Sequence, residues 1–130
     1  MSAEANLYSA LTARAALTAL VGNRIFPDVI PEDCALPAIV YQRVSTSPVT
    51  TIGNVTVAED VHFVITAWAE TRTAADAVAV EIGPALAAAE NPAVDRSTGY
   101  DPECGLYAAT VDVDWWHLPS PDFPQHNLPA

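Results

Sequence analysis

The clearest pattern in the chain is an apolar alternation between Val61 and Trp68. Apolar residues occupy both alternating faces of this segment, with Val61, Phe63, Ile65 and Ala67 on one side. Such two-sided patterning is typical of a central strand that is covered on both sides. The segment therefore predicts the middle strand of a sheet.

The period changes to helical spacing immediately after this strand. The apolar positions of the new stripe are Ala75, Val78, Ala79, Ile82 and Leu86. Thr71 or Thr73 can cap the start of this helix. Gly83–Pro84 inside the stripe predicts a bend or a restart of the helix. We therefore expect an amphipathic helix that packs back on the central strand.

A second helical pattern covers the N-terminal segment from Glu4 to Val21. Its phase slips near Arg14, which predicts a kink or two short helices, and Gly22 is a suitable C-terminal stop. The next residues, Asn23–Pro27, predict a brief extended piece. The prolines that follow indicate an acidic loop.

Two further segments alternate as strands do. These are Ala38–Ser47 and Tyr107–His117. The segment Thr46–Ala58 contains the turn pair Gly53–Asn54 and predicts a long hairpin tip that joins the first of them to the central strand. Residues 92–102 are polar and predict a loop. The chain thus predicts one domain over residues 1–117, and a proline-rich, extended tail over residues 118–130.

Charge narrows the classes of partner. The net charge is −11, the five basic side chains are all arginine, and there is no lysine. Such a surface repels phosphate groups, so we expect neither sequence-independent binding of nucleic acid nor adhesion to an anionic membrane. The acidic start of the chain does not resemble a signal peptide, so Cys34 and Cys104 are expected in a reducing compartment; a bridge between them stays open as an alternative.

No catalytic constellation is present in the sequence. It contains no nucleophile elbow, phosphate loop or Cys-x-x-Cys pair. Asp112 and Asp114 share one face of a strand and predict a solvated acidic face, although a metal site with His117 is a competing interpretation. His62 favours a hydrogen-bonded core or interface histidine over a ligand. We therefore expect no metal, no cofactor and no enzyme activity.

Several apolar residues are candidates for contacts between molecules. Val49, Ile52, Val55 and Val57 make the hairpin tip more apolar than a solvated tip needs, although they can also be plain strand ends. Trp115–Trp116 places one indole on each face of a strand, and the outer one favours either a contact or cover by the chain itself. Phe123 in the tail is a candidate anchor on a neighbouring subunit.

Taken in order, three segments resemble one protein family. They are Leu7 to Pro27, Leu36–Pro37–Ala38–Ile39–Val40–Tyr41–Gln42–Arg43, and Val64 to Thr71 followed by Ala74–Ala77. Together they resemble the tail-completion proteins of long-tailed bacteriophages (siphophages), the group related to tail terminators and tail-to-head joining proteins. The resemblance covers about residues 5 to 117 and does not extend to the tail.

The resemblance implies a fold and a role. The fold is a small α+β domain with a mostly antiparallel or mixed sheet and helices packed on one side, assembled as a homo-hexameric ring. Such a ring caps the head-proximal end of the tail tube, ends tube polymerisation and meets the head connector, or stopper, protein. DNA passes through the lumen without specific binding, and Asp112 and Asp114 could line it. The protein would be assembled in the host cytoplasm and reside in the virion.

Two other classes of function remain open on the sequence. One is a small oligomeric protein-binding scaffold with no phage role. The other is an enzyme whose site is shared between subunits.

Overall fold

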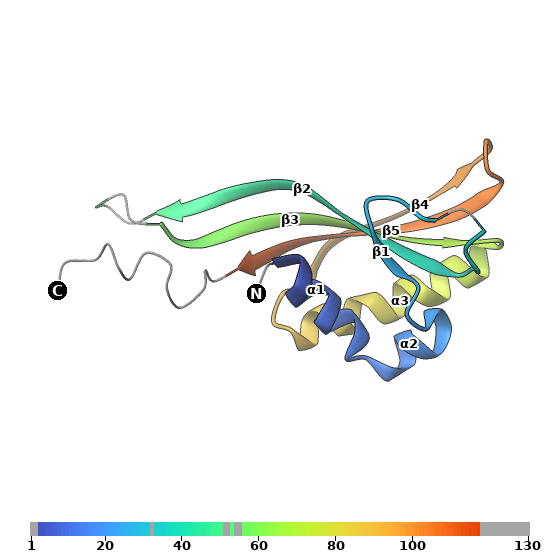
Figure 1. Ribbon diagram of the computed structural model, residues 1–130, viewed down its shortest axis with the longest axis horizontal. Coiled ribbons are helices and arrows are strands. Elements are labelled where there is room, and N and C mark those ends of the chain that lie inside the picture. The colour runs from blue at the N-terminus through green and yellow to red at the C-terminus, as the bar shows by residue number, and fades with distance from the viewer. Residues whose placement is uncertain (1–2, 32, 51–52, 54–55, 118–130) are drawn as a thin grey trace.

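The computed structural model describes residues 3–31, 33–50, 53 and 56–117 (Figure 1). Its elements follow one another as α1 (Ala3–Thr12), α2 (Ala15–Val21), β1 (Ile25–Pro27), β2 (Ala38–Thr50), β3 (Thr56–Ala69), α3 (Arg72–Ala88), β4 (Ala93–Asp101) and β5 (Leu106–His117). The fold is a single small α+β domain, as the sequence predicts.

The predicted break in the N-terminal helix is confirmed. Arg14 has an extended backbone and precedes α2, whose seven residues end at Val21, with Gly22 as the C-cap. Gly22 has a φ of 61°, a left-handed value that glycine adopts without a steric penalty, and its N–H reaches the Thr18 carbonyl at 2.7 Å. The break turns the two helices so that Leu7 and Leu11 of α1 and Leu17 of α2 are all completely buried.

The five strands form one mixed sheet in the order β1-β2-β3-β5-β4. Only β1 and β2 are parallel, and the remaining neighbours are antiparallel. β2 and β3 form the predicted hairpin, with cross-strand partners from Ala38↔Trp68 to Thr50↔Thr56. β3 therefore occupies the middle of the sheet, which confirms the prediction of a central strand.

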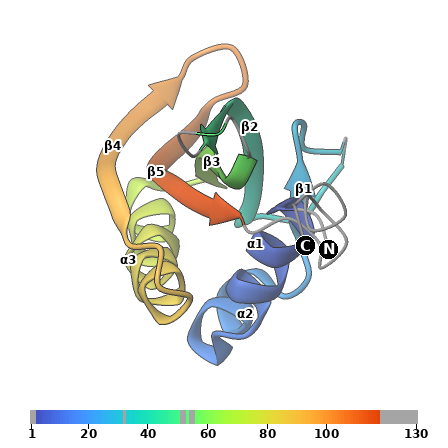
Figure 2. The same ribbon diagram turned by 90° about the vertical axis from the view of Figure 1, so that its left-hand side faces the viewer.

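The prediction that β3 is covered on both sides is wrong. The helices all lie on one face of the sheet (Figure 2). Val61, Phe63 and Ile65 are completely buried on that face, whereas the alternate residues His62 and Val64 are only partly buried. Apolar residues on the second face produced the two-sided pattern without a second layer of helices. We call this second surface the helix-free face.

The core lies between the sheet and the helices. Its largest completely buried side chains are Phe63, Leu7, Leu11, Leu17, Ile39, Ile65, Ile82 and Leu86. Complete burial of a side chain of this size stabilises the folded state by roughly 1.5–3 kcal/mol. The alanine-rich helices contribute small side chains, so these few large residues dominate the core.

Helix α3 begins as predicted but does not restart. The Thr71 hydroxyl accepts a hydrogen bond from the Ala74 N–H at 3.1 Å, which caps the helix. Pro84 lies inside one continuous helix, so the predicted alternative of a restart is wrong. Pro84 is exposed and directly follows Gly83 in the helix.

The prediction of a loop over residues 92–102 is also wrong, because β4 forms there. Residues 94–100 of β4 are all exposed, and the strand pairs only with β5. An edge strand that is solvated on both faces needs no apolar alternation, so the pattern that identifies inner strands is absent. β4 is held by its pairing with β5 and by the contact between the rings of Tyr100 and Tyr107, whose centroids are 4.8 Å apart and whose planes are tilted by 52°.

Asn91 completes the sheet where β4 ends. β4 pairs with β5 only as far as Ala93↔Val113. Beyond that point the buried Asn91 side chain accepts a hydrogen bond from the Trp116 backbone N–H at 3.0 Å and donates one to the Ala89 carbonyl at 3.1 Å. One amide thus substitutes for the missing strand and fixes the end of β5.

We expect the variant Asn91→Ala to lower the free energy of unfolding by about 1–3 kcal/mol, because the Trp116 N–H loses its partner. Chemical denaturation measures this. Asn23→Ala, at an exposed site, is the matched control and should change stability by less than about 0.5 kcal/mol. Equal losses in the two variants would refute the role of Asn91.

Candidate assembly surface

The β2–β3 hairpin extends beyond the helix layer. In Figure 1 both strands continue past the N-terminal end of α1, where no helix covers them. Val49 and Ala58 face each other near the far end; Val49 is partly buried and Ala58 is 9% exposed. No helix of the described residues therefore covers the two strands at this end of the hairpin.

The structure describes only some of the predicted contact residues of the hairpin and the tail. Val57 belongs to β3 by its backbone, but its side chain lies outside the described structure. Ile52, Val55 and Phe123 lie outside the described residues. Their role at an interface therefore stays a prediction.

The two adjacent tryptophans of β5 are separated by the sheet, as the alternation predicts. Trp115 faces the helices and is 4% exposed, whereas Trp116 lies on the helix-free face and is 54% exposed. Trp116 of β5 is the cross-strand partner of Asp60 in β3. The Asp60 Oδ1 atom is buried and has no hydrogen-bond partner among the described residues. The exposed Trp116 indole is a large apolar surface of the kind that a partner can cover.

Asp112 and Asp114 also lie on the helix-free face, on either side of His62. The imidazole Nδ1 is 2.9 Å from the Asp114 Oδ1, and Nε2 is 3.7 Å from the Asp112 Oδ2. The side chains of His62, Asp112 and Asp114 are 28%, 33% and 45% exposed. The sequence predicted a solvated acidic pair and a hydrogen-bonded histidine separately; only the register His62↔Asp114 brings them together.

The competing metal interpretation with His117 is wrong. Asp112 and Asp114 point to the helix-free face, whereas His117 is an odd-numbered position on the opposite face and is 8% exposed. The described residues contain no group of three or more side chains that could hold a metal ion. The role of Asp112 and Asp114 as a solvated acidic face stays a prediction.

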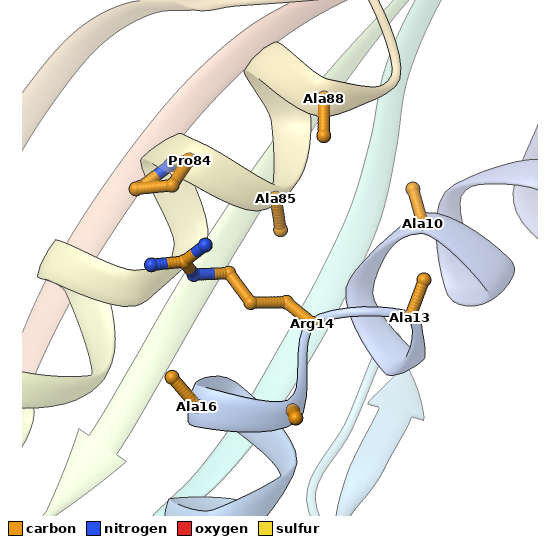
Figure 3. Close-up of a pocket in the computed structure, with 8 residues that line it drawn as sticks. Ala10, Ala13, Arg14, Ala16, Pro84, Ala85 and Ala88 are labelled. Carbon is orange, nitrogen blue, oxygen red and sulfur yellow. The ribbon is translucent and has the colours of Figure 1, made fainter.

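A hollow on the helix side, about 340 Å³ in volume, separates the α1–α2 junction from α3 (Figure 3). Its walls are alanines and Pro84, and the Arg14 side chain crosses it toward α3. The Arg14 guanidinium pairs with Glu81, with Nη2 2.7 Å from Oε2. Because the only charged wall residue is already paired, this hollow offers no polar group for chemistry.

Comparison with known proteins identifies the family of this chain. The family model described as tail completion protein gp17 matches residues 5–118. The chain belongs to this family. No curated protein matches the chain. Membership of the tail completion family identifies the chain as a structural, non-enzymatic protein of a phage-type virion tail.

A solved structure shares the fold of this tail completion protein. It is a chain of the virion of a native gene transfer agent particle, with a TM-score of 0.71 and 17% identity over 87% of this chain and 92% of that chain. At this identity the match supports the fold alone.

No helix of the described residues is long and apolar enough to span a membrane.

The two tryptophans of this tail completion protein should respond differently to truncation. Trp115→Ala should cost about 3–5 kcal/mol of unfolding free energy, because it empties a core position. Trp116→Ala should cost less than about 1 kcal/mol, because the indole is exposed. Denaturant titration of the two variants measures both values. A large loss for Trp116 would show that the exposed indole serves the fold and not an interface.

Proposed function

We propose that six copies of this protein form a ring that caps the head-proximal end of a tail tube. The observation that carries the proposal is the division of the subunit into a helix-covered face and a helix-free face, with a hairpin that extends past the core. A ring needs surfaces on each subunit that stay available after folding, and the hairpin, Trp116 and the helix-free face meet this need.

The helix-free face suits the wall of a channel through which DNA passes. It carries Asp112 and Asp114 beside Thr66 and Thr110, which are cross-strand partners. Carboxylates repel phosphate groups, and the protein as a whole has a net charge of −11. A wall that does not hold phosphates lets a duplex slide without specific binding.

The ring would have two protein partners besides its own copies. The projecting hairpin supports contact with the tail tube or the adjacent subunit, because its strands end furthest from the helices. The opposite end of the subunit would then meet the head connector. Together these contacts end tube polymerisation and join the tail to the head.

Assembly of tails in the presence of variant protein tests this proposal. We expect Ile52→Asp and Trp116→Ala to leave the subunit folded and to produce tails that are uncapped or of irregular length, scored by negative-stain microscopy. Val80→Asp is the matched control, because Val80 is 52% exposed on α3, in the helix layer. Normal capping by both test variants would refute the assignment of this surface, as would an equal defect in the control.

A further inference from the structure

Arg96 differs from the other basic side chains of this acidic protein. Four of the five arginines are engaged within the subunit: Arg14 with Glu81, Arg43 with Glu4, Arg24 with the Pro37 and Leu20 carbonyls, and Arg72 over the Tyr107 ring. Arg96 lies exposed on the edge strand β4, and within the described part of the chain its guanidinium has no partner. Val94, two residues away, is 59% exposed. Within the described residues, the edge strand therefore presents a cation without a partner and, two residues away, an exposed apolar side chain at the point where the pairing register with β5 shifts.

A hollow of complementary chemistry lies elsewhere on the same subunit. It measures about 350 Å³ and is bordered by the β1–β2 connection, the end of β3 and the β4–β5 turn. The lining residues are Asp28, Val29, Ile30, Val40, Trp68, Asp101, Cys104 and Leu106. Most of the lining is apolar, and Asp28 and Asp101 are its two acidic residues. The Asp101 Oδ1 accepts a hydrogen bond from the Glu103 N–H at 2.9 Å, so within the described residues this carboxylate keeps one oxygen without a hydrogen-bond partner, and it keeps its negative charge. Val29 is 72% exposed, so this apolar surface is not closed by the subunit itself.

We propose that Val94 and Arg96 of one copy dock at this hollow, lined by Trp68, Asp28 and Asp101, on a second copy. Val94 would occupy apolar space, and the guanidinium would meet Asp28 and Asp101. The choice of a second copy rests on charge: an acidic hollow selects a cation, and Arg96 is the cation that this chain leaves unpaired within the described residues. This inference rests on the proposed ring, since it names one contact by which the ring closes.

The docking and receiving surfaces are different parts of the subunit. Arg96 and Asp101 are five residues apart along β4, about 17 Å in an extended strand. A contact between two unlike surfaces is heterologous, so each added copy leaves one surface of each kind free until the assembly closes on itself. This is the contact type that a cyclic ring requires.

The native thiol of Cys104 in the hollow allows a direct test. Arg96→Cys in a Cys34→Ser background places one new thiol on the docking surface and keeps one on the receiving surface. The two cannot bridge within one chain, because a disulfide requires Cα atoms within about 7 Å. After mild oxidation of the full-length protein at assembling concentration, we expect a non-reducing gel to show a ladder of covalent multimers. Thr73→Cys in the same background places the new thiol at an exposed site on α3. This control should give at least tenfold less covalent multimer.

A charge exchange gives an independent readout. Arg96→Glu should weaken self-association by about tenfold or more in sedimentation or native mass spectrometry, and adding Asp28→Arg and Asp101→Arg should restore it. The proposal is overturned if oligomers form but Arg96→Cys cross-links no better than Thr73→Cys, or if Arg96→Glu associates normally. Those results leave the ring itself intact. If no oligomer forms even on tail tubes, the proposed ring fails, and this contact fails with it.

Discussion

The packing of one face of β3 against the helices is the interaction on which the rest of the structure depends. Phe63 and Ile65 in the middle of the sheet are completely buried against a helix layer that includes Ile82 and Leu86. These few large side chains hold an otherwise alanine-rich subunit together. Because the helices of the described residues all lie on this side, none of them covers the other face of the sheet. The same constraint that makes the fold therefore leaves the surface that we assign to assembly.

Local features of this fold could be predicted from the sequence because short segments determine them. The helix break at Arg14, the cap at Thr71 and the opposite orientations of Trp115 and Trp116 each follow from periodicity or capping chemistry. Features that depend on the sheet as a whole could not. β4 carries no apolar alternation because it is a solvated edge, and the contact of His62 with Asp114 needs the register of two strands 52 residues apart.

The helix-free face combines features that are of little value to an isolated subunit. It exposes Trp116, leaves an Asp60 oxygen without a partner among the described residues, and gathers acidic side chains around His62. An isolated protein gains no stability from such a surface. For a member of a tail completion family, we propose that other molecules cover this surface in the particle. Family membership and physical arrangement thus support the same conclusion, which is that function resides in contacts and not in catalysis.

Electron cryo-microscopy of tail tubes capped by this protein tests the central claim most directly. The account predicts a sixfold ring at one end of the tube, with the helix-free face and its Asp112 and Asp114 turned toward the channel and the helices outside. The β2–β3 hairpin and Trp116 should contact the tube or a neighbouring subunit. A reconstruction with α3 lining the channel and the helix-free face open to solvent would contradict it.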